Sequence, residues 1–112
     1  MAGKFVLKRS GKDKDGFVFN LHASNGQVVL TSERYESKAS AVNGMESVKT
    51  NAANPARFEL RQGTKEPYFV LKAGNGQVIG MSEHYSSDSA AQAGMDAVTR
   101  AADGAAVDDQ TG

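Results

Sequence analysis

Residues 25–48 read NGQVVLTSERYESKASAVNGMESV, and residues 75–98 read NGQVIGMSEHYSSDSAAQAGMDAV. The two stretches align without a gap at an offset of 50 residues, and identical residues recur throughout. Self-similarity at a fixed period indicates a tandem repeat of one supersecondary unit. The chain is therefore expected to contain two copies of the same arrangement of strands and helix.

Each repeat is expected to begin with three strands. Phe and Leu alternate with charged or smaller residues at 4–8 and again at 57–61, a period of two that is typical of a strand with one buried face. Asn25-Gly26 and Asn75-Gly76 then predict hairpins with type I′ turns, in which both central residues take positive φ. The second and third strands are expected at about 17–23 and 27–31 in the first repeat, and at about 68–73 and 77–81 in the second.

A helix is expected to close each repeat. Ser37 and Ser87 are suited to cap it, because a serine hydroxyl accepts from an amide of the first turn. Gly44 and Gly94 lie inside the helices at a cost of about 1 kcal/mol each, which indicates close approach of helix and sheet. Small and apolar residues form one stripe at helical spacing, namely Ala41, Met45, Val48 and Ala52, and Ala91, Met95, Val98 and Ala102.

These elements predict an α+β fold. Two tandem β-β-β-α repeats, at about 4–54 and 57–102, are expected to form one antiparallel six-stranded sheet with both helices packed on one face. Residues 1–102 are expected to be a single domain, since 112 residues allow only one modest core. Residues 103–112 hold three aspartates and little to bury, so a flexible acidic tail is expected there.

Composition excludes several classes of function. The chain has no Cys, which removes disulfides, thiolate nucleophiles and zinc–thiolate sites. No apolar run approaches the roughly 20 residues of a membrane span, and residues 1–4 lack the apolar stretch of a signal peptide. A cytoplasmic protein without membrane partners is therefore expected.

The run Asn-Gly-Gln-Val-x-x-x-Ser-Glu-x-Tyr-x-Ser, followed by Ala-x-x-Gly-Met-x-x-Val, occurs twice. It resembles the signature of the YegP-like family of uncharacterised bacterial proteins, also called DUF1508 or UPF0339. The resemblance implies a pseudo-twofold arrangement of two units in one sheet with exchanged strands, and hence a monomeric pseudo-dimer. It implies no assigned function. Asp88 and Thr99 stand where the first repeat has the family-like Lys38 and Lys49.

The repeated Ser-Glu-x-Tyr motif is the most chemistry-like feature, and it comprises Ser32, Glu33 and Tyr35 with Ser82, Glu83 and Tyr85. A glutamate general base and a tyrosine donor would need a cleft and perturbed pKa values. The favoured interpretation is structural, with the tyrosine packed under a turn while serine and glutamate satisfy main-chain donors. No catalytic residue is therefore predicted.

Metal and phosphate sites are not predicted either. His22 and His84 fall at non-equivalent positions without partners at metal-ligand spacing, so surface positions are expected. The charged loop at 11–16 is flanked by glycines but lacks the Gly-Lys-Ser/Thr ending of a phosphate loop. It predicts a solvated hairpin loop. No metal and no cofactor are expected.

A candidate binding face follows from strand parity. If the Phe and Leu residues of the strands face the helices, Lys8, Arg61, Tyr68 and Lys72 share the opposite face. Lys, Arg and Tyr on an open sheet can bind single-stranded nucleic acid by phosphate pairing and base stacking. Residues 1–102 carry 13 basic against 10 acidic residues, a mild excess. A solvated antiparallel face commonly bears such residues without binding anything.

Three classes of function remain open. The favoured hypothesis is a non-enzymatic interaction module that acts through the open sheet face or a sheet edge. The alternative is a nucleic-acid-binding protein that uses the basic face, and the third is an enzyme built on the Ser-Glu-x-Tyr motifs. The partner is unknown, and a protein or an anionic ligand such as single-stranded nucleic acid is expected.

Overall fold

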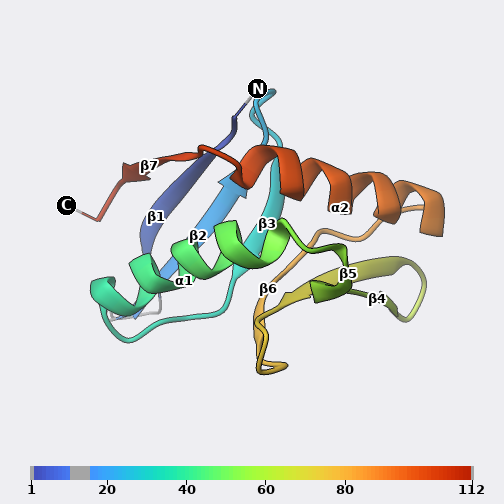
Figure 1. Ribbon diagram of the computed structural model, residues 1–112, viewed down its shortest axis with the longest axis horizontal. Helices are drawn as coiled ribbons and strands as arrows, with labels where there is room; N and C mark the ends of the chain where they lie inside the picture. Colours follow the sequence, from blue (N-terminus) through green and yellow to red (C-terminus); the bar gives the residue numbers. More distant parts are fainter. Residues whose placement is uncertain (1, 11–15, 112) are drawn as a thin grey trace.

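The computed structural model describes residues 2–10 and 16–111, so the loop expected at 11–16 lies almost wholly outside the described residues. Two helices pack on one face of a single sheet (Figure 1). Within the described ranges, neither helix is long and apolar enough to cross a membrane. The elements in chain order are β1 (Lys4–Ser10), β2 (Gly16–His22), β3 (Val28–Ser32), α1 (Lys38–Ala52), the 3-10 turn η1 (Pro55–Arg57), β4 (Phe58–Gln62), β5 (Pro67–Lys72), β6 (Val78–Met81), α2 (Asp88–Ala102) and β7 (Ala106–Asp109).

The strands form one sheet in the order β4-β5-β6-β3-β2-β1-β7. The two repeats meet at its centre, where β3 and β6 run antiparallel and Thr31 pairs with Met81. These residues hold equivalent positions in the two repeats, so the pairing relates the halves by a pseudo-twofold axis. The α+β class with two helices on one face is confirmed, and each half adds its remaining strands outward from the centre.

The sheet differs from the expected six antiparallel strands by a seventh. β7 lies in the segment expected to be a flexible tail, and it pairs in parallel with β1 so that Val107 stands opposite Phe5. The sheet is therefore mixed, and the expectation of an unstructured segment is wrong for residues 106–109. A short acidic strand has no apolar alternation to reveal it, because main-chain pairing and polar side chains hold it rather than a buried stripe.

Chain connectivity explains why only one end of the sheet gains this extra strand. α1 leads through η1 into β4, which takes the place beside β5. α2 ends near the start of β1, where the Gly3 N–H donates to the Ala101 carbonyl at 2.9 Å. The corresponding place beside β2 is already filled by β1, so the chain after α2 pairs with the outer edge of β1 instead. β4 consequently remains an edge strand.

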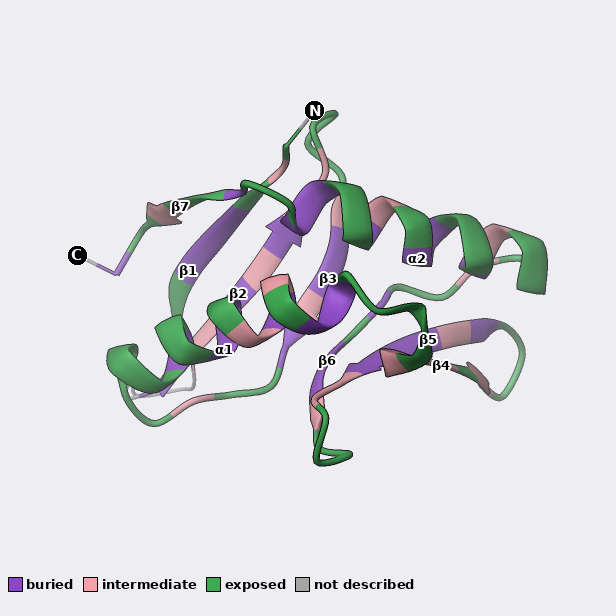
Figure 2. Cartoon of the chain, in the orientation of Figure 1, coloured by how far each residue is buried: buried purple, intermediate pink, exposed green. Residues whose placement is uncertain are grey.

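One core lies between the helices and the sheet and draws on both repeats (Figure 2). Phe5 meets Phe19 edge-on with ring centroids 5.5 Å apart, and Phe58 meets Phe69 in the same way at 5.6 Å. The predicted helix stripes are confirmed, because all eight of their residues are buried. The largest side chains fully buried in this core are Phe5, Leu7, Phe19, Leu21, Leu30, Met45, Val48, Phe69, Leu71 and Val98.

The Asn-Gly hairpins are present, but their turn differs from the expected one. The Ala23 N–H donates to the Gln27 carbonyl, and the Gly26 N–H donates to the Ala23 carbonyl, both at 2.8 Å. These bonds enclose a three-residue loop rather than a two-residue type I′ turn. Gly26 has φ of 87°, and the Asn25 side chain accepts from the Gln27 N–H at 3.0 Å. Asparagine thus contributes its side chain to the loop, and the second repeat forms the same loop.

Serine caps begin both helices, as predicted. The Ser37 hydroxyl accepts from the Ser40 N–H, and the Ser87 hydroxyl accepts from the Ala90 N–H, both at 3.1 Å. Each bond satisfies one of the amides that the first helical turn leaves without an intrahelical partner. The caps set where each helix starts, and so they fix Lys38 and Asp88 as the first residues of α1 and α2.

Candidate functional site

The Ser-Glu-x-Tyr motifs lie where the third strand of each repeat leads into the helix. Ser32 is buried, and its hydroxyl accepts from the Phe19 N–H at 2.9 Å and donates to the Glu33 carbonyl at 2.7 Å. Ser82 makes the equivalent two bonds at the same distances. Each hydroxyl therefore completes main-chain pairing between two strands, and its proton is committed to a carbonyl rather than available to a base.

The motif tyrosine packs against the helix glycine. Tyr35 exchanges main-chain bonds with Phe17 at 2.7 and 2.8 Å, and its ring stacks on Phe19 with centroids 6.1 Å apart. A Cβ placed on Gly44 would lie only 2.7 Å from Tyr35 Cζ, so the glycine makes room for the ring. Burial, and to a lesser degree the Glu33 carboxylate, raises the pKa of the Tyr35 hydroxyl. The hydroxyl stays protonated near neutral pH.

An open groove of about 370 Å³ lies between α1 and the start of β6. Glu33 and Tyr35 contribute to its lining, whereas Ser32 faces the main chain instead. Its α1 wall carries Ser40 and Asn43 and Ser47, where α2 has alanine at all three equivalent positions. Both motif glutamates are exposed to solvent. The three motif residues therefore do not converge on one enclosed site.

Three of the four residues expected on a binding face gather on the sheet face opposite the helices. Tyr68 of β5 pairs with Arg61 of β4, and Lys72 lies at the end of β5. Glu59 lies among them, because its Oε2 accepts from Arg61 Nε at 2.8 Å and stands 3.2 Å from Lys72 Nζ. Hydrogen bonds from Arg61 and then Lys72 hold the pKa of Glu59 below its usual value. The two cations are therefore compensated by a carboxylate.

The fourth residue, Lys8, shares this face but stands apart. It lies on β1, four strands away from β5, which is roughly 19 Å at the usual strand spacing. Val6 and Val70 share the strand parity of these residues, and they are 4% and 0% exposed. Long polar side chains of neighbouring strands cover such small residues. The four candidate residues therefore form a cluster of three and one separate lysine.

The two histidines have different neighbours. His22 Nδ1 lies 3.0 Å from the Gly26 carbonyl oxygen, and the His84 ring stacks on Tyr68 with centroids 5.1 Å apart. In the part of the chain that the structure describes, no three His, Asp or Glu side chains are grouped as a metal ion would require. The stacked pair adds an aromatic surface beside Arg61 and Lys72.

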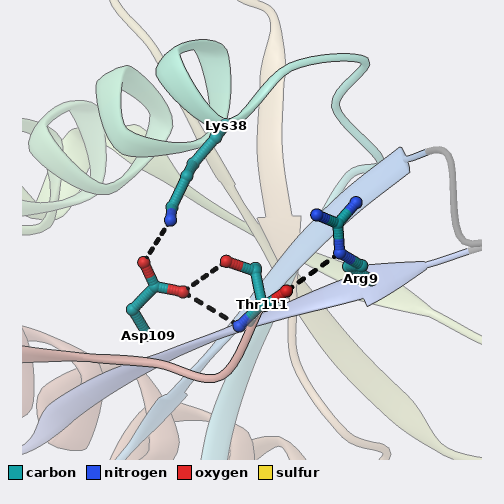
Figure 3. A network of polar contacts seen from close by, with 4 residues as sticks. All are labelled: Arg9, Lys38, Asp109 and Thr111. Atoms are coloured by element: carbon teal, nitrogen blue, oxygen red, sulfur yellow. Dashed lines mark hydrogen bonds and ion pairs between the residues drawn. The ribbon is translucent and has the colours of Figure 1, made fainter.

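The sheet edge at β1 is covered by β7 and anchored by charged side chains (Figure 3). Lys38, the first residue of α1, binds one carboxylate oxygen of Asp109. The other oxygen accepts from the Thr111 N–H at 2.9 Å and hydroxyl at 2.6 Å, and Arg9 Nε donates to the Thr111 carbonyl at 2.9 Å. Lys38, followed by Thr111, holds the pKa of the Asp109 carboxyl well below its usual range.

Main-chain pairing and a second ion pair complete this edge. The Gln110 N–H donates to the Leu7 carbonyl at 2.8 Å, so Leu7 directs its main chain outward toward the added segment. Lys4 Nζ lies 3.8 Å from Asp108 Oδ2. Leu7 is only 1% exposed. The β1 edge is thus covered by one extended segment, which main-chain pairing and the ion pairs of Asp108 and Asp109 hold in place.

The opposite edge, at β4, has the same kind of strand without such a cover. Leu60 stands at the repeat position of Leu7 and pairs with Phe69 of β5. The main-chain groups of Phe69 are bonded toward Ser82, so the Leu60 main chain points away from β5, outward from the sheet. Leu60 is 38% exposed. Within the described residues, no strand pairs with this outer edge.

The family described as Domain of unknown function (DUF1508) matches the chain twice, at residues 13–59 and 64–109. The chain belongs to this family. Both DUF1508 matches end in the strand that follows a helix, β4 in one and β7 in the other, so they run later along the chain than the repeats expected at 4–54 and 57–102.

Relatives in the DUF1508 family agree in fold. The chain is 51% identical over 72 residues to a UPF0339 protein of Bordetella pertussis, covering 63% of this chain and 62% of that protein. The chain therefore matches less than two thirds of that relative's length. The solution NMR structure of yegP from E. coli, a protein of unknown function, has a TM-score of 0.91 at 40% identity, covering 100% of this chain and 96% of that one. The solution NMR structure of a UPF0339 protein from Shewanella oneidensis has a TM-score of 0.89 at 42% identity, covering 99% of this chain and 93% of that one.

Sequence reasoning on this DUF1508 chain named a sheet edge as a possible interaction surface but did not identify which strands form the two edges or how they differ. A signal for them was present, because Lys38 of the first repeat becomes Asp88 in the second, while Phe5 and Leu7 recur as Phe58 and Leu60. The edge strands of the two repeats therefore carry the same apolar residues, whereas the first residues of the two helices carry opposite charges. This difference could be interpreted only once β7 was known to pair with β1, and the sequence pattern did not predict that pairing.

Proposed function

We propose that this chain is a non-enzymatic interaction module that binds an extended segment of a partner protein by strand addition at the outer edge of β4. The observation that supports this most directly is the difference between Leu60, 38% exposed, and Leu7, 1% exposed, at equivalent positions. An exposed apolar side chain beside outward-pointing main-chain groups is the surface used in β-strand addition. β7 on β1 is an example of the same docking within the chain.

The expected affinity of the bare edge is modest. Covering the exposed part of Leu60 contributes up to about 1 kcal/mol, because full burial of a leucine contributes about 1.5–3 kcal/mol. Each main-chain hydrogen bond adds about 0.5–1.5 kcal/mol. The ordering of a flexible segment offsets much of this gain. Side chains that flank the edge must therefore supply selectivity.

A binding role is favoured over catalysis by the state of the motif residues. The serine hydroxyls are committed to main-chain carbonyls, the tyrosines pack against the helices, and the glutamates lie exposed. The serines and tyrosines therefore have structural contacts that explain why they recur in both repeats. The glutamates are solvated, and solvation gives a carboxylate no unusual basicity. The cytoplasmic location and monomeric state stay predictions from the sequence.

Nucleic-acid binding is the second candidate, favoured by the stacked pair of Tyr68 and His84 beside Arg61 and Lys72. Stacked aromatic rings next to cations suit single-stranded bases and phosphates. Glu59 weighs against it, since its carboxylate already pairs with both cations. An anionic strand would have to displace that carboxylate or be repelled by it.

The test is a comparison of captured proteins with two matched variants. Leu60→Lys places a charge on the β4 edge, and Val42→Lys does the same at a residue of α1 that is 41% exposed. We expect wild type and Val42→Lys to retain the same proteins from lysate, and Leu60→Lys to lose them, with nuclease treatment making no difference. Retention by Leu60→Lys equal to wild type would refute docking at β4. Loss of all captured material after nuclease treatment would favour the nucleic-acid alternative.

A further inference from the structure

We infer that the segment bound at β4 runs parallel to it and carries a basic side chain that faces Asp88 at the start of α2. This inference rests on the proposed docking at β4 and goes beyond it by naming the direction and charge of the partner. It identifies the partner as an extended segment with a lysine or arginine at the position that Asp109 holds in β7.

β7 provides the template for the direction. It lies parallel to β1, and its last residue, Asp109, reaches the first residue of α1, Lys38 (Figure 3). β1 and β4 hold equivalent places in the sheet, since each pairs antiparallel with the second strand of its repeat. A segment that repeats the β7 geometry at β4 therefore runs parallel and ends over the first residue of α2.

The charges along the two edges differ at two positions, because Glu59 of β4 replaces Val6 of β1 and Asp88 of α2 replaces Lys38 of α1. Lys4, which lies 3.8 Å from Asp108, corresponds to Arg57 before β4. The segment position equivalent to Asp108 would also lie opposite Glu59, so the charges of Arg57 and Glu59 together select neither sign there. Lys38 corresponds to Asp88, so the next position of the segment must carry the opposite charge from that of Asp109.

Asp88 is placed to make this contact. Its Oδ1 accepts from Gln62 Nε2 at 3.1 Å, which joins the start of α2 to the end of β4. Gln62 stands at the repeat position of Arg9, the residue that bonds the β7 segment at its far end. Asp88 is exposed, so its carboxylate can accept a further donor from the solvent side. The carboxylate thus sits at the end of the edge where β7 is anchored in the other repeat.

The same reversal disfavours a second copy of this chain as the occupant. The β7 segment of another copy would bring its aspartate at position 109 against Asp88, and two like charges in contact repel. The charge difference between the repeats therefore selects a different partner and works against chain-to-chain association at this edge.

Two synthetic peptides, both acetylated and amidated, test the inference. AAVDDQT is the sequence of residues 105–111, and AAVDKQT changes only the position of Asp109 to lysine. Each is titrated into the full chain up to millimolar concentration, and amide chemical shifts of β4 and β1 are followed by NMR. We expect AAVDKQT to shift the β4 amides and to bind about fivefold more tightly than AAVDDQT, the ratio typical of replacing a like-charge contact with an exposed ion pair.

A charge-swapped protein controls for peptide composition. Asp88→Lys introduces the residue that the first repeat already has at its helix start, and it should reverse the preference so that AAVDDQT binds more tightly. A spin label on the peptide N-terminus should broaden Phe58 more than Gln62 if the segment is parallel. Equal binding of both peptides at β4, or an unchanged preference in Asp88→Lys, would overturn the inference while leaving docking at β4 intact. No shift at β4 with either peptide, or shifts at β1 alone, would overturn both.

Discussion

Replacing Gly44 by alanine should destabilise the protein even though alanine favours helices. The new methyl group would overlap the Tyr35 hydroxyl and lie 2.7 Å from Cζ and 3.1 Å from Phe19 Cε2. The ring cannot simply turn away, because Tyr35 is pinned to Phe17 through two main-chain bonds and stacks on Phe19. Overpacking of this kind costs up to about 3 kcal/mol, and alanine returns about 1 kcal/mol of helix propensity. The net loss should be about 2 kcal/mol.

A double-mutant cycle isolates the contact. In a Tyr35→Ala background the ring is gone, so Gly44→Ala should stabilise by about 1 kcal/mol, and the coupling energy should be about 3 kcal/mol. Urea unfolding followed by circular dichroism measures all four proteins. The second repeat is an internal replicate, since a Cβ on Gly94 would lie 2.6 Å from Tyr85 Cζ. If Gly44→Ala alone were more stable than wild type, the close packing of Tyr35 against α1 would be refuted.

Three further predictions concern separate contacts. Ser32→Ala should lower the free energy of unfolding by about 1–3 kcal/mol, because the buried Phe19 N–H loses its acceptor, and unchanged urea midpoints would contradict this. Gly26→Ala should cost about 1–2 kcal/mol from the positive φ alone, since a Cβ there meets no atom within 4 Å, and Gly26→Asn should cost less. Lys38→Met should speed exchange of the Gln110 amide by loosening β7. Because the Asp109 pKa is lowered, the stabilisation that its carboxylate gives the folded state should be present at neutral pH and lost as pH falls below the ordinary value of 3.8. Lys38→Met should weaken that dependence without abolishing it, because the Thr111 hydrogen bonds also lower the pKa.

The repeat, the helices and most strands could be predicted because their signals are local. Serine caps, the stripe from Ala41 to Ala52 and the alternation around Phe5 each depend on neighbours a few residues away. The close approach at Gly44 was also visible, since a glycine inside a helix has a cost that packing must explain.

β7 could not be predicted because its stability comes from distant residues. Asp109 is bound by Lys38, and Thr111 is bound by Arg9, 102 positions away. The sequence around 106–109 shows neither alternation nor a run of β-branched residues. The prediction of a two-residue turn at Gly26 was wrong for a related reason. The hydrogen bond from the Ala23 N–H to the Gln27 carbonyl sets the loop length, and no local residue type indicates that bond.

The candidate binding face was predicted only in part for reasons of geometry. Parity placed Arg61, Tyr68 and Lys72 on one face, and these three do gather there. Parity says nothing of strand order, which separates Lys8 from them. Glu59 has the same parity as Arg61, but parity does not show that its carboxylate reaches both cations.

Amide hydrogen exchange of Leu60, with and without AAVDKQT, tests the central claim of an open, strand-accepting edge most directly. In the protein alone, the Leu60 amide should exchange quickly while that of Leu7, beneath β7, exchanges slowly. At nine-tenths occupancy by the peptide, Leu60 exchange should slow about tenfold, since only the unbound tenth exchanges. Leu60 protection equal to that of Leu7 before peptide is added, or exchange unchanged at that occupancy, would contradict the account.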